Sequence, residues 1–262
     1  MFEAIGFTLA QLELWLLIFV RMLALLSVLP FFSYQQFDPR LRVFFAIALA
    51  SIMVRLIPYP ADFPVEFTML MFYVAREVLV GLCIGMFASF FSEIVKFAGS
   101  QASSMMGLNT ATMVDPTTSE QTEAVPELFN IVAILLILAM NGHHFFLRVM
   151  FDSYFLIPIA EVTFSDQLAP QMVNVISNII SLGIRVGAPM IIIVFLIRIV
   201  IGIMNRLVQE ADIFSVILVL NILVGMYIMM FYWPYFAQMV NMVFNVMQTQ
   251  VLTILRLLSP TF

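Results

Sequence analysis

Charged residues are scarce in this sequence, and their scarcity decides the broad class of protein. Only 10% of the 262 residues are Asp, Glu, Lys or Arg, whereas 63% are apolar. A soluble globular domain has about 25% charged and roughly 45–50% apolar residues. The composition therefore predicts an all-α integral membrane protein. Its long kinked helices and helical hairpins would form one membrane domain over residues 1–262, with length for about six or seven spans of about 20 residues.

Basic clusters and cysteine pairs are also missing. The net charge is −5 and the Lys and Arg residues do not cluster, which argues against nucleic-acid binding and polybasic lipid recognition. The single cysteine, Cys83, excludes an internal disulfide. The first apolar run has no basic region before it, because Glu3 and Glu13 are acidic. We therefore expect a retained helix there and not a signal peptide.

The residue types that enzymes need do not converge in this sequence. His143 and His144 are adjacent, so on a helix they would point about 100° apart and make a poor metal chelate. We find no P-loop, no helical zinc motif and no Gly-x-Ser-x-Gly nucleophile elbow. A nucleophile, a base and a stabilising group cannot be assembled. We expect no enzyme activity, no cofactor and no metal site.

Apolar runs separated by prolines and polar breaks predict the helices. They are expected at about 8–32, 41–57, 67–98, 127–140, an apolar stretch from His144 to Ile157, 169–206, 213–232 and 235–258. The run at 67–98 would be about 48 Å long, which exceeds the ~30 Å hydrocarbon core. Pro189 should kink the long late helix, and Trp233-Pro234 should separate the last two.

A polar stretch from Gly99 to Pro126 interrupts this apolar chain. It is rich in Ser, Thr, Gln and Asn, and we expect a loop. A loop of this length in a compact chain is usually functional or disordered. Met105 and Met106 lead into it, and flexible thioether side chains could seal around varied contents or could simply fill gaps.

Polar side chains, most of them amides, form two stripes on otherwise apolar helices. Their spacing of three and four residues places each set on one helix face. They are Gln171, Asn174, Asn178, Ser181 and Arg185 in one helix, and Gln238, Asn241, Asn245 and Gln248 in the last. Such groups need partners or water. They could line a wet lumen or form hydrogen bonds between helices.

Charges and glycines inside the apolar runs are interpreted as packing features. Glu93 and Lys96 are three residues apart and can pair, whereas Glu13 and Arg21 could pair only through a partner. The predicted structural charges are Arg21, Glu77, Glu93, Lys96 and Arg206.

Small residues four apart predict close helix approach. They occur at Gly81/Gly85, Gly183/Gly187 and Gly99/Ser103/Gly107.

The order of landmarks along nearly the whole chain resembles one family, that of FliR, the flagellar type III export-gate subunit. The landmarks are Arg21, Pro30, Pro39, Arg40, Arg42, Glu77, Gly81, Gly85, Gly99, Gly107, Asp115-Pro116, Asn141-Gly142-His143, Ser153, Pro158, Pro189, Gly202 and Arg206. The chain departs from the family after Arg206, where Gln209-Glu210-Ala211-Asp212 replaces a Pro-Gln-x-Asn run, and at Asn221, where a lysine is common.

The resemblance implies a non-enzymatic subunit that lines and closes a channel for unfolded flagellar proteins. It implies a hetero-oligomeric gate in the bacterial inner membrane, within the flagellar basal body. The implied partners are several copies each of FliP and FliQ, together with FlhB and FlhA. The implied plug or gate residues are Met105, Met106, Gly107, Leu108, Asn109, Thr110, Ala111, Thr112, Met113, Val114, Asp115 and Pro116.

Two other functions stay open at this point. One is the equivalent subunit of a virulence injectisome, with the same fold and different cargo. The other is a secondary transporter for a small molecule, which predicts inverted repeats and broken helices around a midplane site. Pro189 could mark a broken helix, but we see no matching interruption at a repeat position.

Overall fold

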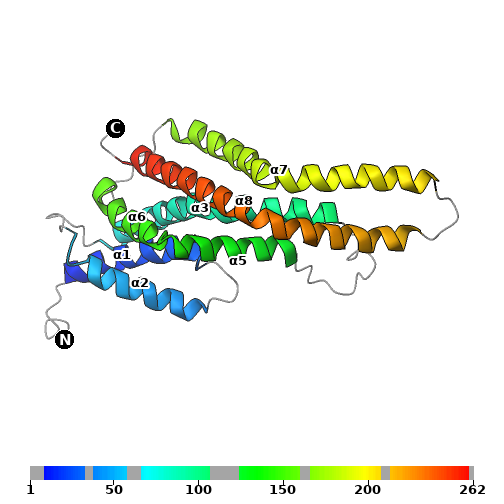
Figure 1. Ribbon diagram of the computed structural model, residues 1–262. Helices are drawn as coiled ribbons and strands as arrows, with labels where there is room; N and C mark the ends of the chain where they lie inside the picture. The colour runs from blue at the N-terminus through cyan, green and yellow to red at the C-terminus, as the bar shows by residue number, and fades with distance from the viewer. Residues whose placement is uncertain are drawn as a thin grey trace. The chain divides into compact units, whose positions relative to one another are not determined.

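Long helices dominate the structure, a computed structural model that describes residues 9–32, 38–57, 66–106, 124–159, 166–207 and 213–259. Figure 1 shows their arrangement. The described residues contain no strand. The helices are α1 (Leu9–Val28), α2 (Pro39–Met53), α3 (Phe67–Met106), α5 (Ala124–Ala139), α6 (His143–Leu156), α7 (Leu168–Leu207) and α8 (Ile213–Leu257). The all-α prediction is confirmed.

In the described part of the chain, four helices are long and apolar enough to cross a membrane, or five if α5 and α6 together form one bent span. The sequence length alone had allowed six or seven spans. The described residues yield fewer because α3 and α7 each have 40 residues and α8 has 45. At 1.5 Å per residue these helices are roughly 60 Å long or more, about twice the thickness of the hydrocarbon core.

Two predicted helix boundaries are wrong. The loop was expected to begin at Gly99, but α3 continues to Met106, so the first eight residues of the polar stretch are helical. Close packing outweighs the weak helix propensity of glycine and serine there, because Gly99 lies directly against Pro126 of α5. The last two predicted helices are one helix, α8, with Pro234 inside it. A proline removes a single helical donor, which neighbouring helices can offset in an apolar setting.

Local signals account for two other boundaries, the start of α2 and the break between α5 and α6. Asp38 caps α2 by accepting a hydrogen bond from the backbone N–H of Arg40 at 2.8 Å, and Pro39 occupies the first turn. Asn141 separates α5 from α6 with a φ of 59°, a left-handed conformation that asparagine tolerates. Pro189 lies inside α7, and Figure 1 shows a bend part-way along that helix, as expected for an internal proline.

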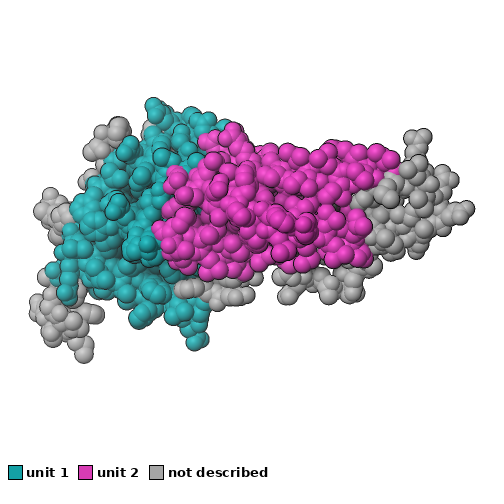
Figure 2. All heavy atoms as spheres, in the orientation of Figure 1, with its two compact units in different colours: residues 1–91, 141–175, 246–262 teal, residues 92–140, 176–245 magenta. Residues whose placement is uncertain are grey.

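The described helices pack into two compact units (Figure 2). Unit 1 comprises residues 1–91, 141–175 and 246–262, so it contains α1, α2, α6, the start of α3, the start of α7 and the end of α8. In unit 2, residues 92–140 and 176–245 bring the rest of α3, α7 and α8 around α5. The prediction of one membrane domain over 1–262 stays a prediction.

Candidate functional site

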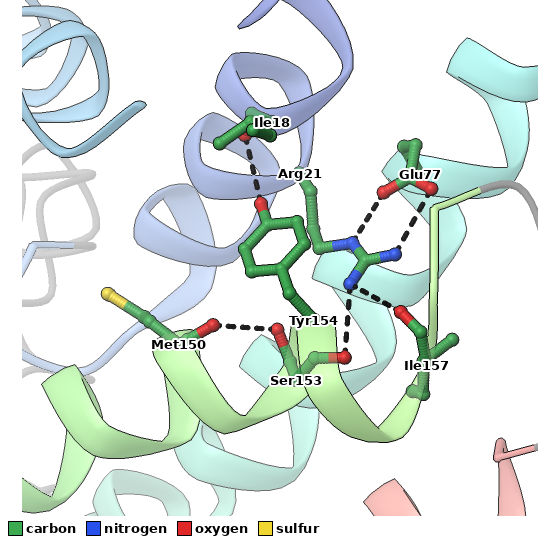
Figure 3. Close-up of polar contacts among 7 residues, drawn as sticks. All are labelled: Ile18, Arg21, Glu77, Met150, Ser153, Tyr154 and Ile157. Atoms are coloured by element: carbon green, nitrogen blue, oxygen red, sulfur yellow. Dashed lines mark hydrogen bonds and ion pairs between the residues drawn. The ribbon is translucent and has the colours of Figure 1, made fainter. Parts of the chain in front are cut away.

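A buried polar centre ties three helices of unit 1 together (Figure 3). Arg21 of α1 and Glu77 of α3 form an ion pair in which both side chains are fully buried. Arg21 donates from Nε to Glu77 Oε2 at 2.5 Å and from Nη2 to Glu77 Oε1 at 3.1 Å. This two-point contact uses the planar fork of the guanidinium, which fixes the orientation of both side chains.

The third guanidinium nitrogen holds the end of α6. Arg21 Nη1 donates to the backbone carbonyl oxygens of Ser153 at 3.2 Å and Ile157 at 3.1 Å. The Ser153 carbonyl also accepts a hydrogen bond from the backbone N–H of Ile157 at 2.9 Å, and Pro158 has no backbone N–H with which to continue the helix. A cation at this end also complements the helix dipole. Arg21 therefore acts as the cap of α6.

Tyr154 closes the centre from α6. Its ring lies 4.3 Å from the guanidinium carbon of Arg21, and its hydroxyl donates to the carbonyl oxygen of Ile18 at 3.1 Å. Each polar group in Figure 3 therefore has a partner inside the protein. These contacts indicate a structural role, in which the centre holds α1, α3 and α6 together.

Glycines bring α3 close to α1 beside this centre. A side-chain carbon at Gly81 would lie 2.5 Å from the carbonyl oxygen of Arg21, and one at Gly85 would lie 2.9 Å from the Cβ of Val28. Only glycine permits this approach of the two backbones. The predicted close packing at Gly81 and Gly85 is confirmed, and it brings Glu77, one turn away, within reach of Arg21.

An aromatic cluster packs between helices of unit 2. The ring of Phe129 on α5 lies 4.8 Å from Phe236, 5.7 Å from Trp233 and 6.0 Å from Tyr232, all on α8. The Tyr232 hydroxyl donates to the carbonyl oxygen of Val186 on α7. These contacts join α5, α7 and α8 without a charged group among the residues named.

The predicted structural charges differ in their surroundings. Arg21 pairs with Glu77, 56 residues away, and not with Glu13. Glu93 is exposed and Lys96 is half-buried, and no ion pair joins them in the described part of the chain. The side chain of Arg206 lies outside the described residues.

The amide stripes lie largely on the surface of the single chain. Gln171 donates to Gln250 Oε1 at 3.1 Å, a contact between α7 and α8, and Asn245 donates to Asn241 Oδ1 at 3.4 Å. Gln248 is half-buried. The exposed members are Asn174, Asn178, Ser181, Arg185, Gln238, Asn241 and Asn245. These groups are available to water or to a partner, and their role as a lumen lining stays a prediction.

Most of the predicted plug residues lie outside the residues that the structure describes. Met105 and Met106 form the end of α3, and Met106 is fully buried. Residues 107–116 and the departure from the family at 209–212 lie outside the described residues. No three His, Cys, Asp or Glu side chains gather into a metal-binding group in the described ranges.

Comparison with known proteins defines the class. Residues 12–247 match the family described as "Bacterial export proteins, family 1". This match covers most of the 262 residues, so the chain belongs to that family of bacterial export proteins. The FliR proteins compared next confirm the resemblance to that family.

Curated relatives are similar over most of their length. The flagellar biosynthetic protein FliR of Bacillus subtilis (strain 168) is 29% identical over 215 residues, which cover 80% of this chain and 82% of that protein. FliR of Buchnera aphidicola subsp. Baizongia pistaciae is 27% identical over 237 residues, with coverage of 90% and 91%. FliR of Escherichia coli (strain K12) is 24% identical over 237 residues, with coverage of 90% of each.

Proposed function

We propose that this chain is a non-enzymatic subunit of the flagellar type III protein export gate in the bacterial inner membrane. The observation that carries the proposal is the family match over residues 12–247. The helices long enough to cross a membrane support it. The relatives reported above are named flagellar proteins, which favours the flagellum over a virulence injectisome.

The exposed faces of α7 and α8 support a role inside a larger assembly. Phe195 and Leu196 on α7, and Leu223 and Met230 on α8, are each more than half exposed in the single chain. Lipid could cover such side chains, but the exposed amides Asn178 and Gln238 on the same helices are costly against lipid. A surface that mixes apolar side chains and amides suits protein partners, and we propose FliP, FliQ, FlhB and FlhA.

We further propose that residues Gly107 to Pro116 obstruct the channel at rest. They follow directly on α3 and precede α5, and both helices are anchored inside unit 2. Gly99 of α3 lies against Pro126 of α5, so a side-chain carbon at Gly99 would be 2.6 Å from the Pro126 Cα. The polar segment thus starts and ends at helices that are packed against each other.

Deletion of Thr110–Met113 tests the obstruction. In the complete export complex, we expect the deletion to raise the resting ion leak while export of substrate proteins continues. The matched control deletes Ser119–Thr122, four residues of the same polar stretch outside the proposed plug, and should leave the leak unchanged. An unchanged resting leak in the Thr110–Met113 deletion would exclude the plug.

Complementation separates the flagellar from the injectisome assignment. A strain that lacks its own flagellar counterpart should regain secretion of flagellar proteins when it expresses this chain with its genomic neighbours. Restoration of effector secretion in an injectisome-deficient strain, without flagellar secretion, would reverse the assignment. Uptake of a defined small solute by the purified chain would instead favour a transporter.

A further inference from the structure

The exposed face of α2 has a regular pattern of residues. Ala46, Ala50 and Met53 are buried, so a narrow stripe of the helix packs against its neighbours in unit 1. Residues on the opposite side of α2 repeat at the same spacing of three and four, which places them on one helix face. All of them are exposed, and they are Arg40, Phe44, Ile47, Ser51 and Arg55.

The middle of this face is apolar and needs no water. Phe44 is 65% exposed and Ile47 is 41% exposed. Ser51 is the polar residue between them and the end of the helix, and its hydroxyl donates to the carbonyl oxygen of Ile47 at 2.8 Å. The same hydroxyl accepts a hydrogen bond from Trp15 Nε1 of α1 at 3.2 Å. A polar group that is satisfied inside the protein can lie against lipid.

Arginines stand at both ends of the face. Arg40 and Arg55 are 15 residues apart, which is about 22 Å along a helix. Neither arginine forms an ion pair with another residue of the described ranges. Asp38, two residues before Arg40, accepts a hydrogen bond from the Arg40 backbone N–H as the cap of α2. Long arginine side chains carry their charge beyond the edge of an apolar surface, so both guanidinium groups can reach an external anion.

Composition distinguishes this face from the exposed faces of α7 and α8. Those helices expose amides such as Asn178 and Gln238, which are costly against lipid, whereas α2 contains no Asn or Gln. The charges at the ends of α2 are positive in a chain whose net charge is −5. An apolar strip with a cation at each end is complementary to lipid, in which acyl chains are bounded by phosphate-bearing headgroups.

We propose that the exposed face of α2 binds anionic phospholipid. Acyl chains lie along Phe44 and Ile47, and headgroup phosphates bind Arg40 and Arg55. Each arginine binds an individual headgroup, so the surface differs from the polybasic patch that the sequence lacks. The inference rests on the membrane location in the proposed function and does not depend on export or on the plug.

A photoreactive amino acid identifies what covers this face. Benzoylphenylalanine would replace Phe44 in one variant and Leu223 of α8, which is 62% exposed, in the matched control. Each variant would be co-expressed with its genomic neighbours, transferred to nanodiscs of phosphatidylglycerol and phosphatidylcholine, and irradiated. We expect position 44 to capture phospholipid and position 223 to capture another protein. Capture of a protein by position 44 would overturn the inference.

Titration with phosphatidylglycerol tests the two arginines. Native mass spectrometry of the full chain in detergent would count the bound lipids. Arg40→Gln with Arg55→Gln should weaken binding about fivefold at each end, because each arginine near anionic lipid contributes on that scale. Arg40→Lys with Arg55→Lys keeps both charges and should retain most of the affinity. Arg148→Gln removes an exposed arginine of α6 as the matched control, and a loss there equal to that of the double Gln variant would contradict the proposal.

Competing ligands distinguish a lipid from a free anion. Phosphatidylcholine should bind more weakly than phosphatidylglycerol in the same titration, because its headgroup has no net charge. Inorganic phosphate in excess should not displace phosphatidylglycerol, because phosphate has no acyl chain to contact Phe44 and Ile47. Displacement by inorganic phosphate, or equal affinity for the two lipids, would show that the face is not a site for anionic phospholipid.

The outcomes separate this inference from the proposed function. If the complex assembles and secretes flagellar proteins but position 44 captures protein, the lipid surface is wrong and the export function stands. If the chain is a stable monomer and position 44 captures phospholipid, the export function is wrong and the lipid surface stands.

Discussion

The two units of this molecule use different interactions to hold their helices together. Unit 1 joins α1, α3 and α6 through a fully buried arginine whose guanidinium reaches Glu77 and two backbone carbonyls. Unit 2 joins α5 and α8 through the rings around Phe129. In both, a buried tyrosine hydroxyl donates to a backbone carbonyl of another helix, from Tyr154 in unit 1 and from Tyr232 in unit 2.

The difference lies in how strictly each arrangement specifies geometry. An aromatic cluster gains energy from buried area and tolerates several ring orientations. A buried ion pair is favourable only with near-ideal hydrogen-bond geometry, because both charges have lost their water. We infer that the Arg21 centre specifies the register of α1, α3 and α6, whereas the Phe129 cluster supplies cohesion between α5 and α8.

Removal of one partner of the ion pair should have the largest effect. Arg21→Met leaves Glu77 buried without its partner and uncaps α6, so we expect a loss of about 3–5 kcal/mol in the free energy of unfolding. Glu77→Gln should lose less, because a glutamine oxygen can still accept a hydrogen bond from Arg21. Denaturant titration of the purified protein in detergent measures both.

A double replacement tests whether the cost is that of an unpaired charge. Arg21→Met with Glu77→Leu removes both charges and keeps the volume apolar. We expect the double variant to be more stable than Arg21→Met alone. If the double variant is as much less stable than the unsubstituted protein as Arg21→Met is, the ion pair contributes net stability, and the view that it chiefly specifies register is wrong.

Replacement of glycine should change the free energy of unfolding by an intermediate amount. Gly81→Ala places a carbon against the backbone of α1 and should destabilise unit 1 by about 1–3 kcal/mol through overpacking. Gly202→Ala is the matched control, because nothing lies within 4 Å of a side-chain carbon there. The control should be neutral or slightly stabilising, since alanine favours helix more than glycine. Equal losses at the two sites would contradict close packing of α3 on α1.

The two tyrosines offer the smallest and most closely matched comparison. Tyr154→Phe and Tyr232→Phe each remove one hydroxyl whose acceptor is a backbone carbonyl of another helix. We expect each to cost about 0.5–1.5 kcal/mol, measured by the same titration. The Tyr154→Phe variant keeps an aromatic ring facing the Arg21 guanidinium. A much larger loss in unit 1 would therefore show that the hydroxyl also orders the ion pair.

The sequence predicted the helical membrane class, the family and the close packing at Gly81 and Gly85. Composition and residue spacing report these features directly, because they depend on local burial and local approach. The loop boundary at Gly99 and the break at Pro234 were wrong, because tertiary packing outweighed local propensity at both places. Neither error could be avoided from a window of neighbouring residues.

The partner of Arg21 is a feature of the site that could not be predicted from the sequence. Two lone charges of opposite sign inside apolar helices were the available signal, but Glu77 lies 56 residues away and no spacing rule joins them. The cap on α6 is harder still to predict, since its acceptors are backbone carbonyls of Ser153 and Ile157.

We propose that this chain works as one subunit of a membrane export gate, and the mass of its native complex would test this proposal. The tagged chain would be co-expressed with its genomic neighbours and extracted gently. Native mass spectrometry would then measure the mass of the intact complex. We expect a large complex with one copy of this chain and several copies of two smaller membrane proteins. A stable monomer or simple dimer of this chain alone would contradict it.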